Sequence, residues 1–234
     1  NTWNGIATDT EVITKIVMTW ALCPILAAVI AAILLPLTGL ALRISRMHLF
    51  RQDALTRYAL IVAGVFGAYS LGANNIANVM GPFVEAVQFD AVDVYGLFSL
   101  NSLQQLFLLG GIAISIGVFT YSRRVMFTVG RDLYNLSPVA GWVVIMAHSI
   151  VLFLFASKGL SAWLNGVGLP QMPLVPVSSS QAVIGAILGI GLIRGRHGIR
   201  WNVLGEIGLG WLFTPLISAL ICIAALAAFY RFLG

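Results

Sequence analysis

The sequence predicts an all-α, polytopic transmembrane protein. Of its 234 residues, 59% are hydrophobic and only 9% are charged, whereas soluble domains carry about 25% charged residues. The mean hydropathy is +0.96. Long apolar runs alternate with short clusters of basic residues, and runs of this length cross a hydrocarbon core of about 30 Å. Composition and run length therefore indicate helices that span a membrane.

Five apolar runs are long enough to span the membrane, and one is too short. The first carries Pro36, where a tilt or a break would accommodate its excess length. The short run contains 12 residues, which would rise only about 18 Å as a helix. Between the fourth run and the short one, Gly and Pro interrupt residues 159–177, so this segment is either an outer loop or a re-entrant segment. We expect the runs at 12–42, 58–87, 98–121, 139–156, 182–193 (the short run) and 201–230.

The basic residues set the orientation of these runs. Ten of the 13 Lys and Arg residues fall in three connections, at 43–57, 123–131 and 194–200. Basic loops remain on the cytoplasmic side. The acidic connection with Glu85, Asp90 and Asp93 would then lie outside. Basic and non-basic connections alternate along the chain, as a multi-pass protein of the plasma membrane (cell inner membrane) requires.

The same pattern excludes several function classes. The net charge of +5 comes from loop clusters rather than from a continuous basic stripe, so no nucleic-acid partner is expected. Cys23 and Cys222 lie inside apolar runs and predict no disulfide. The three histidines are scattered without metal-ligand spacing, so we expect no enzyme and no metal other than Na⁺. His148 lies near the centre of its run, where a proton relay and a structural hydrogen bond are both open.

Two polar segments stand out within the apolar runs. The first polar segment, residues 72–83, reads GANNIANVMGPF and contains three asparagines, Asn74, Asn75 and Asn78. The second polar segment, residues 176–181, reads PVSSSQ and directly precedes the short run. Unpaired amides and hydroxyls are costly in hydrocarbon, so such groups are usually functional. We expect the two segments to form two walls of one buried site, although helix packing and an N-cap would also explain them.

An internal repeat indicates how the chain is organised. The pattern Ile-x-x-x-Trp-x-x-x-Pro at residues 16–24 recurs at 207–215. In the topology above the two copies cross the membrane in opposite directions, as in the inverted repeats of many secondary transporters. Interfacial tryptophans alone would be the simpler explanation. We expect residues 1–42 to end a first inverted half, 43–57 to be a cytoplasmic loop, and 58–234 to be the second half.

At these residues the sequence resembles the inorganic phosphate transporter family, which comprises sodium- or proton-coupled phosphate permeases and their sulfate-carrying relatives. Residues 72–78 resemble its Gly-Ala-Asn-Asp-Val-Ala-Asn motif, and residues 176–181 resemble its Pro-Val-Ser-Thr-Thr-His motif. Residues 124–130, RVMFTVG, are similar to its Arg-Val-x-x-Thr-Val-Gly loop. The likeness covers nearly the whole chain, as a second half with the last helix of a first half.

The resemblance implies an inverted-repeat secondary transporter with discontinuous or re-entrant helices, which carries an inorganic oxyanion together with a cation. The residues that would line the substrate site are Asn74, Asn75, Asn78, Ser178, Ser179 and Ser180. Asn and Ser side chains supply neutral donors to an anion. The start of the helix after the second polar segment would add backbone N–H groups and the positive end of the helix dipole.

Two departures from the family motifs matter, Asn75 in place of Asp and Gln181 in place of His, and Ser179 and Ser180 also replace the two Thr residues. Asn75, Asn78 and Gln181 are the expected coupling-ion ligands, and carbonyls at a break in the helix around Gly72 could assist them. The departures leave Na⁺ and H⁺ open as coupling ions, and sulfate open beside phosphate. A non-transporting packing subunit is the alternative from another class.

The predicted partners follow from this assignment. They are phosphate or sulfate, the co-transported cation, the lipid bilayer, the N-terminal half of the same transporter and a second copy in a homodimer. No cofactor is expected beyond Na⁺ as coupling ion.

Overall fold

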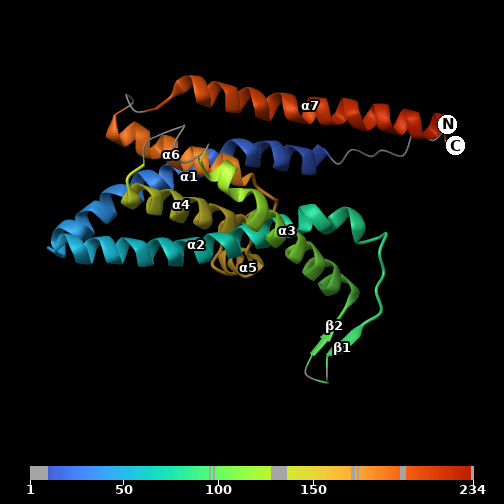
Figure 1. Cartoon of the computed structure of the whole chain (residues 1–234), viewed down its shortest axis with the longest axis horizontal. Helices are drawn as coiled ribbons and strands as arrows, with labels where there is room; N and C mark the ends of the chain where they lie inside the picture. Colours follow the sequence, from blue (N-terminus) through green and yellow to red (C-terminus); the bar gives the residue numbers. More distant parts are fainter. Residues whose placement is uncertain are drawn as a thin grey trace.

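The computed structural model describes residues 10–94, 96, 98–127, 136–169, 172, 174–195 and 199–232. The described part contains seven α-helices, one 3-10 turn and one two-stranded hairpin. Figure 1 shows most of the long helices lying along one common direction, while the helix at residues 102–127 crosses them obliquely. The part of the chain that the structure describes is therefore almost entirely helical, as the composition predicts.

The first two helices form a long antiparallel pair. Helix α1 spans Thr10–Ile44 and continues through Pro24 and Pro36 without a break. Helix α2 spans Leu49–Met80, so only residues 45–48 lie outside helix between the two. The expected basic loop at 43–57 is therefore mostly helical, because Arg51 and Arg57 occupy the first turns of α2. Arg57 makes an exposed ion pair of 2.8 Å with Asp53.

A hairpin connects α2 to the third helix at the end away from the basic residues. The 3-10 turn Gly81–Phe83 follows α2, and the strands β1 (Val92–Val94) and β2 (Phe98–Leu100) pair antiparallel. Helix α3 then spans Ser102–Phe127, four residues later than the expected start at residue 98, because β2 occupies that place. In the segment 124–130, which resembles the family's loop, residues 128–130 lie outside the described residues.

The remaining helices agree closely with the expected runs. They are α4 (Pro138–Ala156), α6 (Ser179–Arg194) and α7 (Trp201–Phe232). The short helix α5 (Lys158–Gly166) matches no expected run, and it occupies the start of the segment predicted as an outer loop or re-entrant segment. Residues 167–169 and 174–178 are not helical, so the interrupted segment is not one helix, as predicted. In Figure 1, α1 and α7 run in opposite directions, as an inverted repeat requires.

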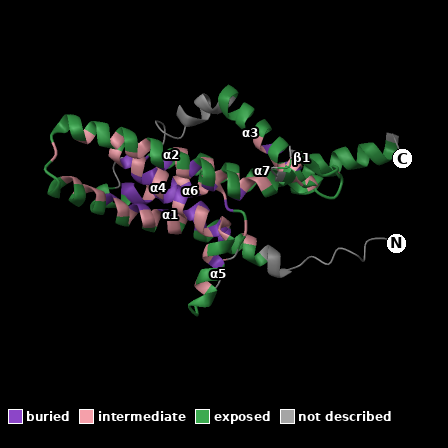
Figure 2. Ribbon diagram, turned by 90° about the horizontal axis from the view of Figure 1, so that it is seen from below, coloured by how far each residue is buried: buried purple, intermediate pink, exposed green. Residues whose placement is uncertain are grey.

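The core lies between α1, α4 and α6, with α2 against α4 (Figure 2). Small residues permit this packing. Among them Cys23, Ala27 and Ala31 of α1 are fully buried. On α6, Gly185 and Gly189 lie against the backbone of Pro24 and Ala28. Close approach through small residues is how helices pack where no hydrophobic effect drives them together.

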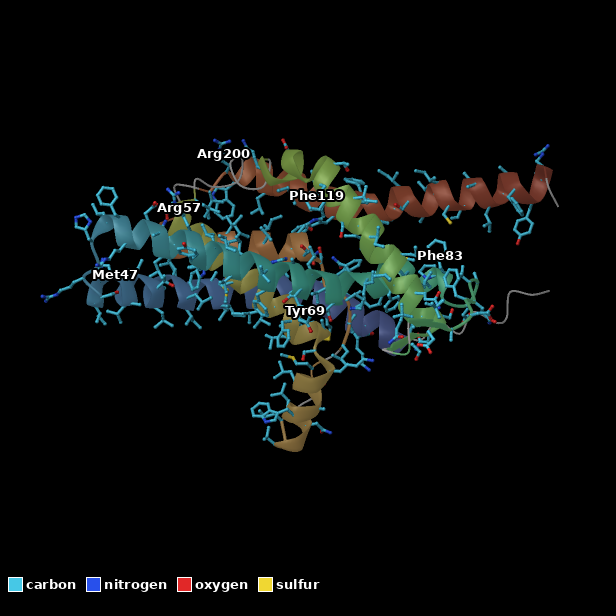
Figure 3. All side chains as sticks on the ribbon, turned by 60° about the horizontal axis from the view of Figure 1, so that its bottom comes forward. Met47, Arg57, Tyr69, Phe83, Phe119 and Arg200 are labelled. Atoms are coloured by element: carbon cyan, nitrogen blue, oxygen red, sulfur yellow. The ribbon has the colours of Figure 1, made fainter. Side chains whose placement is uncertain are left out.

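Five of the described helices are long and apolar enough to cross a membrane, and α6 is shorter. Its 16 residues rise about 24 Å, less than the roughly 30 Å of a hydrocarbon core. Figure 3 shows Met47, Arg57 and Arg200 toward one end of the molecule and Phe83 toward the other. If Arg194 marks the cytoplasmic surface, as the basic connections predict, the start of α6 would lie inside the membrane.

Candidate functional site

Asn74 lies on the face of α2 that packs into the core. Ala63, Gly67, Ser70 and Asn74 are the buried residues of this helix, and their spacing of three and four places them on one side. Asn74 is only 5% exposed. The helix is continuous through Gly72 up to Met80. The expected break with unpaired carbonyls is therefore not present, because all residues of the segment up to Met80 adopt helical geometry.

The Asn74 side chain joins the two polar segments directly. Its Nδ2 donates to the carbonyl oxygen of Val177 at 2.8 Å, and its Oδ1 accepts from the Val177 backbone N–H at 3.2 Å. This reciprocal pair fixes the orientation of the amide, since a flipped amide would face donor to donor and acceptor to acceptor. The pair is buried, so breaking it would leave unpaired polar groups in the core. Asn74 thus holds the backbone just before Ser178 in place.

Asn75 and Asn78 face a different space from Asn74. Both line a cavity of about 800 Å³ between α2 and α3, and Asn78 is exposed while Asn75 is half-buried. Asn75 Oδ1 accepts from Asn74 Nδ2 at 3.1 Å. From α3 the cavity receives Ser115 and aromatic side chains. Ser115 was not expected from the sequence, because one serine inside an apolar run gives no signal of its own.

The three serines open helix α6. Ser178 is the N-cap, and its Oγ accepts from the Gln181 N–H at 3.4 Å and lies 3.1 Å from Ser180 Oγ. The Cys23 thiol donates to the Ser178 carbonyl at 3.7 Å, which ties this turn to α1. Helix α6 starts at Ser179, three residues before the expected start at residue 182. First-turn N–H groups of a helix have no partner within the helix, so this turn can accept an anion.

Helix α4 contributes His148, whose role the sequence left open. Nε2 of the buried His148 lies 3.1 Å from Ser179 Oγ. The contact orients the Ser179 hydroxyl from the side of α4. The sequence left a proton relay and a structural hydrogen bond open for His148. The structure supports the hydrogen bond, which His148 makes with the second polar segment.

Gln181 carries an unsatisfied oxygen. Its Oε1 is buried and has no hydrogen-bond partner, alone among the buried side-chain oxygens and nitrogens of the described residues. A buried acceptor without a partner is costly, and a water molecule or a bound ion would satisfy it. No group of three or more His, Cys, Asp or Glu side chains in the described ranges could hold a metal ion.

The structure thus brings Asn74, Asn75 and the second polar segment together through one chain of contacts. Ser180 and Asn78 are both exposed. No described hydrogen bond links Asn78 to the serines. Asn78 lines the cavity beside α3, whereas none of the three serines does.

Five helices long enough to cross a membrane, together with a buried contact between two neutral polar segments, are consistent with a membrane transporter. The chain belongs to the phosphate transporter family, whose description matches residues 43–222. This confirms the family expected from the two polar segments. Since the family is one of transporters, the prediction that the chain is not an enzyme is also confirmed.

Individual relatives agree with the family. The chain is 27% identical over 207 residues to a protein of Methanocaldococcus jannaschii described as a phosphate permease, which covers 88% of this chain and 57% of that protein. It is 29% identical over 179 residues to the sodium-dependent phosphate transporter 1-A of Danio rerio, covering 76% of this chain and 25% of that protein. The human sodium-dependent phosphate transporter 1 is 26% identical over 176 residues and is covered to 23%.

A solved structure shares the fold. The sodium-dependent phosphate transporter aligns with a TM-score of 0.59 and 21% identity, covering 87% of this chain and 63% of that one. The chain thus spans a little over half of the archaeal relative and about a quarter of the animal ones. None of these relatives is described as a sulfate carrier, so the sulfate alternative finds no support.

Proposed function

We propose that this chain forms part of a secondary transporter that carries inorganic phosphate across the plasma membrane together with Na⁺. The observation that carries the proposal is the reciprocal pair between Asn74 and Val177. This pair joins two polar segments that lie 103 residues apart and that both match the family motifs. A subunit that only packs helices would not need an open turn of serines beside this pair.

The anion would be held by neutral donors. The hydroxyls of Ser179 and Ser180, the first-turn N–H groups of α6 and the Nδ2 groups of Asn75 and Asn78 are suitable in number and chemistry. The N-terminal end of α6 adds a partial positive charge of roughly half a unit. Asn74 would be a positioning residue rather than a ligand, because its N–H groups are already donated to Asn75 and Val177.

Na⁺ is favoured over H⁺ as the coupling ion. Animal relatives are described as sodium-dependent. A hard cation is bound by oxygen atoms, and the unpaired Oε1 of Gln181 and the Oδ1 of Asn75 are suitable. With Asn75 in place of the family's Asp, these ligands are neutral, so the bound anion itself would supply the balancing charge. This explains how binding of the two ions would be coupled.

We also propose that a first inverted half completes the transporter and that two complete transporters form a homodimer. Transport would follow from movement of one half against the other around the shared site.

Uptake of radiolabelled phosphate into proteoliposomes tests the proposal with the full-length protein. We expect Asn74→Ala and Ser179→Ala to abolish Na⁺-driven uptake while insertion into the membrane remains normal. Ser149→Ala is the matched control, because the Ser149 hydroxyl donates only to Ile145 of its own helix, at 2.6 Å. Normal uptake by both variants, or uptake of sulfate with equal efficiency, would overturn the assignment.

A further inference from the structure

The α1/α6 interface shows what covers the small-residue face of α1. A Cβ atom added at Gly185 would lie 2.6 Å from Pro24 Cα, and one added at Gly189 would lie 2.7 Å from Ala28 Cα. The residues on this face of α1 are 0–8% exposed, namely Thr19, Cys23, Ala27, Ala31 and Leu35. A helix with glycines four residues apart therefore fits closely against this face.

The internal repeat gives α7 a face that corresponds to the small-residue face of α1. The pattern that relates residues 16–24 to residues 207–215 continues beyond its prolines along both helices. The α7 positions that correspond to the buried α1 face are Gly210, Thr214, Ser218, Cys222 and Leu226. All are small except the last, which is Leu in both copies. Ala28, at the closest approach of α6, likewise corresponds to Ala219.

On α7 this face has no cover in the described chain. Residues 212–231 are all exposed, and Figure 2 shows this half of α7 projecting beyond the core. The earlier turns of α7 are different, because Val203, Ile207 and Trp211 pack against the core. At roughly 100° per residue, the face defined by these three continues into Thr214 and Ser218. The uncovered face is thus the continuation of an existing packing surface.

We propose that the α7 face of Thr214, Ser218, Cys222 and Leu226 is the docking surface for a helix of the first inverted half, the counterpart of α6. The occupant would carry small residues four positions apart, as α6 does. A second copy of this chain does not supply it, because the glycine face of its α6 is already covered by its own α1. The two halves would then exchange their last helices, each completing the core of the other. The proposal rests on the two-half architecture of the proposed function.

A size series on α7 tests the docking surface in the full-length protein. Ser218 corresponds to Ala27, which is fully buried, and Ala224 corresponds to Ile33, which is 54% exposed. We expect Ser218→Leu to lower the thermal midpoint in detergent by several degrees, while Ser218→Ala and the matched control Ala224→Leu leave it unchanged. Equal stability of Ser218→Leu and the parent, or equal damage by Ala224→Leu, would contradict the assigned face.

Photo-crosslinking identifies the occupant even if Ser218→Leu does not fold. A benzophenone side chain replaces Leu226, the counterpart of Leu35, and the adducts are mapped by mass spectrometry. We expect crosslinks within one polypeptide, to a peptide that precedes Asn1 and carries small residues four apart. Adducts to lipid alone, or to a second copy of the protein, would overturn the proposal. Neither assay needs phosphate, so a failure here is distinct from a failure of the transport assignment.

Discussion

Substitution of the α6 glycines tests the packing that places the second polar segment. At Gly185 and Gly189 the atoms facing an added methyl group belong to the α1 backbone, at 2.6 and 2.7 Å from the Cα atoms of Pro24 and Ala28 and closer still to their carbonyl oxygens. Real Cβ atoms essentially never approach below 3.0 Å. Backbone cannot rotate away as a side chain can, so α1 and α6 must separate.

The magnitude follows from this separation. Moving the helices apart by about 1 Å loses dispersion contacts along the whole interface, and overpacking of this kind typically costs 1–3 kcal/mol. The gain in helix propensity from Gly to Ala, about 1 kcal/mol, offsets part of the cost. Because backbone atoms face both positions, the cost lies at the upper end of this range, which leaves a net loss of about 2 kcal/mol after the propensity gain. At roughly 2–4 °C per kcal/mol for a chain of this size, we expect each Ala substitution to lower the midpoint by about 4–8 °C, and Leu at either position to prevent folding.

Thermal unfolding of the purified protein in detergent measures the effect, with two other glycines as controls. Gly64 has open space around it, so Gly64→Ala should not destabilise the protein. An added methyl group at Gly67 would meet Ser149 Oγ at 2.8 Å, a rotatable hydroxyl, so its effect should be intermediate. If Gly185→Ala and Gly189→Ala melt with the parent, or if Gly64→Ala is as damaging as either, the reasoning from close helix approach is wrong.

Two further predictions concern the start of α6. Loss of the hydrogen bond between His148 and Ser179 should cost about 0.5–1.5 kcal/mol, so His148→Ala should raise the KM for phosphate about 2- to 12-fold. His148→Gln can still form a hydrogen bond and should bring the KM most of the way back to that of the parent. An unchanged KM in His148→Ala would exclude this role of His148. Loss of the N-cap in Ser178→Ala should cost about 0.5–2 kcal/mol of stability and also weaken phosphate binding. The control Ser137→Ala removes the matching cap of α4, where Ser137 accepts from Ala140 N–H at 3.3 Å, and should lower stability without changing phosphate affinity. Equal effects of the two cap variants on affinity would refute the assignment.

The helices could be predicted from the sequence because their signals are local. Apolar length and basic clusters located α4 and α7 to within one or two residues, and the interrupted segment before α6 was expected from its Gly and Pro residues. The boundaries of α2 and α3 were less accurate. The basic residues after α1 read as a loop, yet arginine is compatible with helix, and tertiary packing extended α2 across them.

The site could be predicted as two segments but not as a geometry. Residue types and motif resemblance identified Asn74 and the serines, yet placed all three asparagines in the lining of one substrate site. The direction of each side chain depends on the rotation of α2 against α4, which turns Asn74 to Val177 and Asn75 to the α3 cavity. The contact of His148 with Ser179 and the cavity position of Ser115 depend in the same way on tertiary packing. Sequence patterns carry no information on such rotations.

Protection of cysteines by phosphate tests most directly whether the two polar segments share one site. Single cysteines replace Asn78, Ser180 or Ser99, all of them exposed positions, in a Cys222→Ala background of the full-length protein. With Na⁺ present, phosphate should slow thiol labelling at positions 78 and 180 in parallel and leave the control at position 99 in β2 unaffected. Protection of only one of the two positions, or of neither, would contradict a shared phosphate site.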